Sequence, residues 1–318
     1  MKKYIQIGFI AFLLSVVFPT NAQNGSTQKA ITGKSPFLEK IDRALYNIYM
    51  GKPFLEFDPL PTVHNRRILT VGMGQVLDDY LSPIPQEGLF LRHRRLGYER
   101  ERREMWQIQA WQSLMDIHVG LYRNPINGSG MQYLLFDGSF GPAWSLLQKS
   151  WLKWNVALLG NLSLGSTIKS SNTNNVFNLK LSTGFDLSTD LLFPVKIKEY
   201  KMFFHYRAQI SALHLTFHPG YGQPYYDYIG GENGAPLKFY LTQPWNRLKM
   251  NQMFAVDIPF ARSTMMLGFE HGYTNMDLNG RKFRELYLGL ALGYSFDSFK
   301  LSGSRSIRNN RIDKSFHF

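Results

Sequence analysis

The segment Leu286–Phe296, with the sequence LYLGLALGYSF, alternates large apolar residues with small or polar ones. A period of two indicates a β-strand, because successive side chains of a strand point to opposite faces. One face is an unbroken row of leucines that ends in two aromatic residues, and the other is small or polar. This pattern is typical of a transmembrane β-barrel strand, which turns its apolar face to lipid and places aromatic residues at the interface.

The N-terminal segment predicts export of the chain. Lys2 and Lys3 precede an apolar stretch, Ile5–Phe18, that is too short and too interrupted to cross a membrane as a helix. Small or polar residues follow before a cleavage point, so residues 1–22 are predicted to be a signal peptide. The sequence has no cysteine, which excludes a lipoprotein anchor, and no later segment has the run of apolar residues that a transmembrane helix requires.

Residues 23–65 are expected to be a periplasmic leader that contains one short helix. Ser35 and Pro36 provide a helix cap and a first helical residue, and apolar residues follow at helical spacing until Gly51. The pattern predicts an amphipathic helix over residues 36–50. Such a helix can pack on the rim of a barrel, fill its lumen as a plug, or bind a partner.

From Arg66 to Phe296 the two-residue alternation continues through about ten segments. Backbone groups at an unpaired strand edge find no partner in hydrocarbon, so a sheet of such strands must close. The expected fold class is all-β: a transmembrane antiparallel β-barrel of about 10 strands, or of 12 if Asp190–Tyr200 contains a further short pair. Residues 297–318 are expected to form a basic tail.

The connections suggest an orientation for this barrel. With a periplasmic N-terminus, the outward connections fall near residues 78–88, 124–130, 166–175, 217–244 and 274–281, and they are long or rich in Asn, Gly and Ser. The inward connections, near residues 193–200 and 259–263, are shorter. Long outer loops and short inner turns are typical of outer-membrane barrels. The longest loop contains four tyrosines, which suit recognition of sugars or proteins, or a fold over the barrel mouth.

The charge of the chain restricts its partners. The formal net charge is +13, and removal of Lys2 and Lys3 with the signal peptide lowers it to +11. Nucleic acid is not expected as a partner after export. The basic balance instead suits attraction to lipopolysaccharide phosphates or a merely solvated surface. The predicted location is the cell outer membrane, and the expected partners are its lipids, including lipopolysaccharide, and the barrel-assembly machinery.

The segment Leu77–Pro83, with the sequence LDDYLSP, follows the glycine-bearing first strand. It resembles the Asp-Thr-Tyr-Leu-Ser-Pro-like turn of an uncharacterised family of outer-membrane β-barrel proteins from Bacteroidota, known as a domain of unknown function. Asp79 stands where the family pattern has threonine. The similar region extends from about Ile68 to Phe296. The resemblance implies a barrel and no known reaction, and Asp78 and Ser82 are expected to bond turn amides.

Polar residues at mid-strand positions are expected to face the lumen. They form either a catalytic cluster or, as is usual in a narrow lumen, a charge network that fills it. No zinc spacing, phosphate loop or dinucleotide fingerprint occurs, so neither a metal nor a cofactor is expected. The predicted members of the lumen charge network are Asp116, His118, Lys153, His205, Arg207, Glu270 and Glu285.

One segment is faintly similar to the His-x-Ser-Asn region of outer-membrane lipid A deacylases. In Phe269–Asn275, His271 is expected on the lipid-facing side, where a histidine could help to attack an acyl ester. Tyr273 occupies the position of the family's serine, and Thr274 is one residue away and predicted to point inward. Glu270, His271 and Thr274 are therefore the candidate catalytic residues of the alternative, a lipid-acting hydrolase.

These patterns leave three classes of function. The favoured one is a non-enzymatic outer-membrane barrel with a structural, binding or narrow-channel role. The alternative is a lipid-acting outer-membrane hydrolase, and a third class is a soluble periplasmic β-sandwich that binds carbohydrate. A barrel of about ten strands is too narrow for a general porin, since open aqueous channels need about sixteen or more strands.

Overall fold

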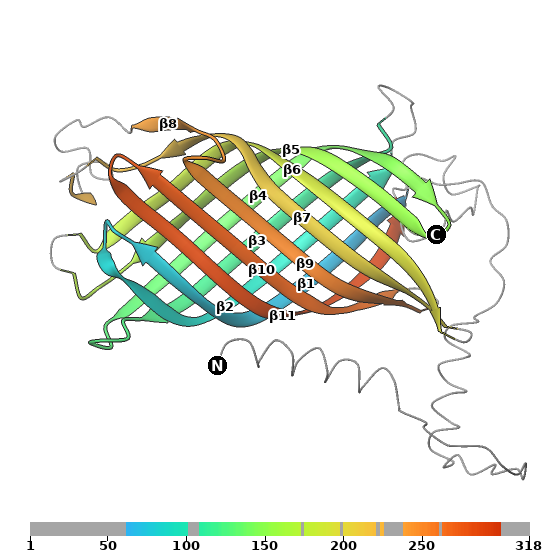
Figure 1. Cartoon of the computed structure of the whole chain (residues 1–318), viewed down its shortest axis with the longest axis horizontal. Coiled ribbons are helices and arrows are strands. Elements are labelled where there is room, and N and C mark those ends of the chain that lie inside the picture. The colour runs from blue at the N-terminus through green and yellow to red at the C-terminus, as the bar shows by residue number, and fades with distance from the viewer. Residues whose placement is uncertain are drawn as a thin grey trace, which may run out of the picture. The chain divides into compact units, whose positions relative to one another are not determined.

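The computed structural model describes residues 62–100, 108–172, 175–197, 200–220, 223–225, 238–260 and 263–299. The predicted signal peptide, the helix over residues 36–50 and most of the predicted tail lie outside these residues. Within them the chain forms β-strands joined by turns and loops (Figure 1). The strands are β1 (Thr62–Asp78), β2 (Ser82–Arg100), β3 (Ala110–Arg123), β4 (Gly130–Lys149), β5 (Leu152–Ile168), β6 (Phe177–Ile197), β7 (Tyr200–Phe217), β8 (Phe239–Thr242), β9 (Arg247–Pro259), β10 (Thr264–Leu278) and β11 (Arg281–Phe299).

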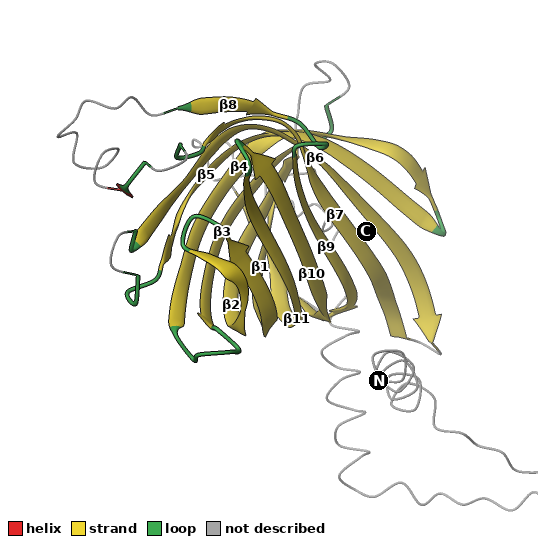
Figure 2. Cartoon of the chain, turned by 60° about the vertical axis from the view of Figure 1, so that its left-hand side comes forward, coloured by secondary structure: helices red, strands yellow, loops and turns green. Residues whose placement is uncertain are grey.

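The strands close into an antiparallel barrel. Each strand pairs with its neighbours along the chain, β1 pairs with β11, and β6 pairs with β7. β8 and β9 both pair with β7, β8 at residues 214–217 and β9 at residues 203–210, so together they act as one interrupted strand. The barrel therefore has ten strand positions, which confirms the predicted fold class. Figure 2 shows the same strands after a turn of 60° that brings the left-hand side of Figure 1 forward.

The strand bounds differ in detail from those predicted. β1 begins at Thr62 and β11 ends at Phe299, so the paired region is longer at both ends than residues 66–296. The alternative of 12 strands does not hold. β6 continues to Ile197 and pairs with β7 from Ser182 to its end. The segment after Asp190 therefore extends an existing strand and does not form a new pair.

We call the barrel end that carries residues 79–81 and 279–280 the loop end, and the opposite end, where β1 begins, the terminal end. The prediction of long connections at residues 78–88 and 274–281 is wrong, because both hairpins stay paired almost to their tips. Asn279 and Gly280 have φ values of 53° and 68°, which suits a two-residue hairpin turn. Polar pairs cover the outside of these hairpins, Gln75 with Glu87 at 3.0 Å and Arg284 with Asn275 at 2.9 Å.

The outer face of the barrel is apolar along its middle. Alternate residues of every long strand are large, hydrophobic and exposed, such as Leu121 (63%), Leu162 (52%) and Leu292 (60%). Near the terminal end the outside becomes aromatic, with exposed Trp151, Trp154, Phe193 and Tyr294. A soluble monomer rarely exposes so much contiguous apolar surface. This outer band has the composition of a lipid-facing wall.

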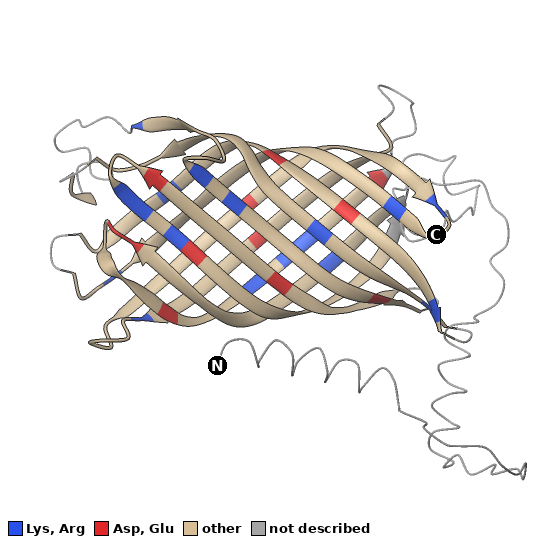
Figure 3. Ribbon diagram, viewed as in Figure 1, with Lys and Arg blue, Asp and Glu red and all other residues tan. Residues whose placement is uncertain are grey.

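Apolar and charged side chains together fill the interior of the barrel. Near the loop end, aromatic and aliphatic residues form one cluster, and a second apolar cluster lies deeper in the barrel around Leu96 and Met253. Glycines make room for flat rings on the wall, since a Cβ at Gly120 would overlap the Tyr122 ring and a Cβ at Gly272 would overlap the Tyr287 ring. Between the apolar clusters lie charged residues, and Figure 3 shows Lys, Arg, Asp and Glu spread along the barrel strands.

A β-bulge in β7 changes which residues face inward. Phe185 of β6 pairs with Leu213, but Asp186 pairs with Ser211, so Ala212 is extra. Before the bulge the odd-numbered residues point inward, and after it Leu213 and Leu215 are exposed and His214 is buried. The two-residue alternation of the sequence breaks here, so simple alternation would assign His214 to lipid.

Candidate functional site

The middle of the lumen holds a cluster of two arginines and two carboxylates. Arg92 donates to both oxygens of Asp116, at 2.8 and 2.7 Å from its Nε, and its Nη1 lies 2.6 Å from Glu270. Arg94 donates to the same Glu270 oxygen at 2.5 Å, and the other oxygen accepts from Thr70 at 2.7 Å. All four charged side chains are buried. Buried charges persist when they are paired and hydrogen-bonded, as these are.

A second cluster lies nearer the terminal end. Arg66 donates to Asp257 at 2.7 Å and to the His205 Nδ1 at 2.5 Å. Because a guanidinium can only donate, that nitrogen accepts, and His205 carries its proton on Nε2, which faces Asp190 at 3.0 Å. Arg207 completes the cluster with an ion pair to Asp190 at 2.8 Å. The cluster joins β1, β6, β7 and β9 through one histidine.

Several of these bonds span the lumen from wall to wall. Tyr98 of β2 accepts from Arg207 of β7 at 2.5 Å, and these strands are five positions apart in the ring of ten. Lys249 of β9 lies 2.6 Å from Asp137 of β4, four positions away. At the loop end, Asp78 of β1 pairs with Lys180 of β6 at 2.7 Å, again five positions apart. The lumen is thus bridged at three levels along its length.

A third polar group sits beneath the apolar cluster of the loop end. The His118 Nδ1 lies 3.3 Å from Glu285, and Tyr133 and Thr274 both donate to the other oxygen of that carboxylate, at 3.3 and 3.5 Å. The His118 ring makes edge contacts with Tyr133 and Tyr287 at centroid distances of 5.3 and 5.1 Å. These contacts fix the histidine among aromatic rings, where a substrate would find no room.

The predicted lumen network can now be placed. Asp116 and Glu270 share the central cluster, His205 and Arg207 share the second, and His118 and Glu285 form the third. Lys153 pairs along the backbone with Leu192 near the terminal end. The network predicted from sequence left out Arg66, Arg92, Arg94 and His214, as well as the carboxylates Asp190 and Asp257. The three arginines lie on β1 and β2, where the sequence pattern did not show clearly which residues face inward. His214 follows the bulge at Ala212, so simple alternation would place it on the outer face.

Loops fold over the barrel at the loop end. The Tyr80 hydroxyl donates to the backbone oxygen of Gln223 at 2.7 Å, and Tyr225 and Tyr240 pack against the apolar cluster below. Asp78 accepts from Asn178 at 2.9 Å and from the backbone amide of Tyr80 at 3.3 Å. The turn motif therefore contributes to this cover, since its aspartate organises the turn and also ties it to the opposite wall.

The candidate hydrolase residues lie on opposite sides of the wall. His271 is on the outer face with Phe269, as the alternation predicts. Thr274 points into the lumen toward Glu285, and Glu270 is held inside by the two arginines of the central cluster. A nucleophile needs its base within hydrogen-bond reach, and a strand backbone separates these groups. The three residues do not form one catalytic site.

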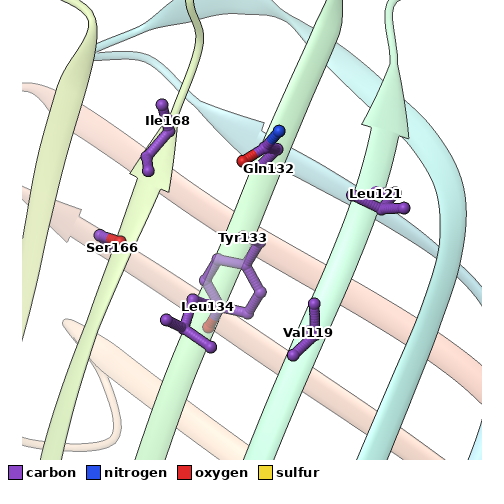
Figure 4. Close-up of a pocket in the computed structure, with 7 residues that line it drawn as sticks. All are labelled: Val119, Leu121, Gln132, Tyr133, Leu134, Ser166 and Ile168. Carbon is purple, nitrogen blue, oxygen red and sulfur yellow. The ribbon is translucent and has the colours of Figure 1, made fainter.

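Two depressions of the outer surface stand out among the described residues. The smaller, about 200 Å³, lies on β3, β4 and β5 near the loop end, and Figure 4 shows its lining side chains. Apart from Gln132, Tyr133 and Ser166, the labelled side chains are aliphatic. The larger, about 860 Å³, crosses the outside from β3 to β8. Within the residues that the structure describes, no group of His, Asp and Glu side chains could hold a metal ion, and no helix is long and apolar enough to cross a membrane.

These features define a class: a closed ten-stranded antiparallel barrel with an apolar outside and an interior cross-linked by ion pairs. The chain belongs to a family described as "Protein of unknown function (DUF3316)", whose model matches residues 58–303. This match confirms the predicted membership of a family of unknown function. No curated protein sequence matches the chain.

Several solved barrels are similar in architecture. The transport unit of the autotransporter AIDA-I from Escherichia coli is 10% identical, with a TM-score of 0.41, over 84% of this chain and 100% of that one. The β domain of the Bordetella autotransporter BrkA is 11% identical, with a TM-score of 0.39, over 75% and 100% of the two chains. The outer membrane protease OmpT from Escherichia coli is 7% identical, with a TM-score of 0.39, over 77% and 99%.

Proposed function

We propose that this protein is an outer-membrane β-barrel that neither conducts nor catalyses, and that it acts by binding through its loop end. The observation that carries the proposal is the contrast between its two faces. Large apolar side chains coat the outside, and ion pairs that reach from wall to wall, Asp78 with Lys180 and Asp137 with Lys249, occupy the inside. This contrast supports a wall with lipid outside and a sealed lumen inside.

The binding role rests on the loop end. Its cover combines tyrosines with polar amides, and the β1–β2 and β10–β11 hairpins carry polar pairs on their outer faces. Exposed polar pairs are stable in water but not in hydrocarbon, so we infer that these hairpins extend beyond the apolar band. In the proposed orientation the loop end faces the exterior of the cell. Partners of the barrel are membrane lipid, including lipopolysaccharide, and the barrel-assembly machinery that inserts it.

A test of the proposal is made on the full-length protein purified from membranes. We expect recovery only with detergent, because the exposed leucines would aggregate in water. In planar bilayers the wild-type protein should insert without steps in ion current. Recovery in the soluble fraction without detergent would contradict the membrane assignment, and a steady current through the wild-type protein would contradict the sealed lumen.

Lipid hydrolysis is tested separately. Purified protein is incubated with lipid A and phospholipid, and released fatty acid is measured for the wild type and for His271→Ala. We expect no release from either, because Thr274 and Glu270 face away from His271. Release that disappears in His271→Ala would overturn the non-enzymatic assignment.

A further inference from the structure

A shallow furrow crosses the outer face of β3 to β6, within the larger depression described above. Two neighbouring rows of residues, each paired from strand to strand, alternate between large and small side chains. The small members form a zigzag between the rows: Ser113, Gly138, Gly160 and Thr183. Large side chains, including Phe140, Leu162 and Phe185, stand on either side. The zigzag is therefore a continuous channel one side chain deep.

The two glycines of the furrow are not required by packing. A Cβ added at Gly138 would lie no closer than 3.8 Å to any atom, and one at Gly160 no closer than 3.6 Å. Most inward-facing glycines of the barrel strands would instead meet another atom closer than 3.0 Å, as Gly141 and Gly165 do. A glycine weakens a strand and often marks the close approach of a ligand. The open space over these two residues faces away from the barrel interior.

The dimensions of the furrow suit a hydrocarbon chain. The four small residues lie on four neighbouring strands, so three steps of about 4.8 Å each give the furrow a length of about 14 Å. Barrel strands tilt by about 35–45°, so the furrow runs obliquely, and its rise along the barrel axis is less than the hydrocarbon depth of one leaflet, about 15 Å. The Thr183 hydroxyl donates to the backbone oxygen of Asn161 at 3.0 Å, so this side chain already has its partner. The occupant therefore needs no hydrogen-bonding groups.

We propose that this furrow binds one acyl chain of a membrane lipid whose head group lies toward the loop end. The inference rests on the proposed membrane location and adds a specific lipid site to it. The furrow rises toward the loop end, where Leu215 and Leu241 continue its lining and Lys238 is exposed before β8. A cation there suits the phosphate of a lipid head group.

A second copy of the barrel fits this surface less well. Stable protein interfaces bury about 800 Å² per partner, and two convex barrel walls touch only along a narrow strip. Phe140 and Phe185 rise beside the glycines and would hold a convex partner away from them. A flexible chain of methylene groups reaches the floor between them.

The test uses the full-length protein in vesicles of phosphatidylethanolamine and phosphatidylglycerol that contain a phospholipid with a diazirine on one acyl chain. After illumination, mass spectrometry locates the labelled peptides, and native mass spectrometry counts retained lipid. The variants Gly138→Leu and Gly160→Leu fill the furrow without displacing the barrel interior. Ala208→Leu, on the outer face of β7 outside the furrow, adds comparable bulk as a control.

We expect wild type and Ala208→Leu to label the furrow peptides at least threefold above other peptides of the apolar band, and to retain one lipid. Both furrow variants should lose the enrichment and the retained lipid while keeping the label on β11. Even labelling around the barrel in all four proteins, or a wild-type dimer linked at β4 and β5, would overturn the acyl site. Absence of label from β11 would instead contradict the membrane location itself.

Discussion

At the scale of single residues, paired charges inside the lumen decide whether the barrel is stable. Arg92 is buried and bonds two carboxylates on β3 and β10. Breaking a buried pair by removing one partner costs about 3–5 kcal/mol, because the other charge stays behind in a dry site. We therefore expect Arg92 to stabilise the folded barrel.

The variant Arg92→Ala should lower the free energy of unfolding by about 3–5 kcal/mol, measured by tryptophan fluorescence in urea with detergent. Arg95→Ala, which removes an outward-facing arginine from the same strand, is the control and should change it by less than about 0.5 kcal/mol. Replacing both partners, in Arg92→Met with Asp116→Leu, should recover part of the loss. Equal stability of Arg92→Ala and wild type would show that the cluster is solvated.

His218 makes the loop end sensitive to acid. Burial, together with the nearby Lys180, lowers the pKa of His218 to about 4. The folded state therefore disfavours the protonated ring, and its stability falls as the pH drops below the unfolded pKa of about 6.5. The loss is complete once the pH passes below the folded value.

Limited proteolysis of the connection between β7 and β9 should therefore accelerate between pH 6.5 and pH 4. The variant His218→Gln cannot gain the proton and should keep the same cleavage rate over this range. Asp277→Asn, on an exposed residue of β10, serves as the control and should behave as wild type does. An identical acid response in His218→Gln would assign the effect to another group.

At the scale of strands, sequence periodicity predicted most of the elements because each wall residue faces either lipid or the lumen. The outer rows of β3, β5 and β11 were predictable for this reason, as Met115, Leu162 and Leu290 are all exposed. The extent of the hairpin tips was not predictable. Polar pairs replace leucine on their outer faces, so the apolar alternation ends while the backbone pairing of the strands continues. The partners of lumen residues were also hidden, since Arg66 and Asp257 meet only after the sheet closes.

Deleting Ala212 should leave the barrel folded. Without the extra residue, the pairs Phe185 with Leu213 and Asp186 with Ser211 follow one another as a regular ladder, so His214 still points inward to Asp186 and Leu213 still points outward. The heat-modifiable band shift of folded barrels on gels should therefore persist for this deletion. Ala212→Val, which keeps the bulge, should also retain the shift, and loss of the shift in the deletion variant would show that the bulge itself is needed for folding.

At the scale of the whole molecule, we expect the bridges across the lumen to keep the barrel closed to ions. The prediction concerns two of them, Asp137 with Lys249 and Asp78 with Lys180. Replacing all four residues by alanine removes both partners of each pair and leaves empty volume in place of an unpaired charge. We expect a small steady current in planar bilayers, where the wild type is silent.

Alanine substitution of Leu288 and Leu290 is the matched control for that experiment. It removes side-chain volume from the outside of β11 and leaves the lumen intact. This control should insert and remain silent. A silent quadruple variant that is folded would show that the apolar clusters alone seal the lumen.

The pairing of β1 with β11 has a consequence for biogenesis. The first and last strands of the barrel are direct neighbours, separated by more than two hundred residues of chain. The bonds between opposite walls can form only after β1 pairs with β11, because an open sheet holds its opposite sides too far apart. Loss of the last strand would thus expose two unpaired strand edges and would leave several lumen charges without a partner. We therefore expect assembly to be all-or-none and to depend on the C-terminal strand of the barrel.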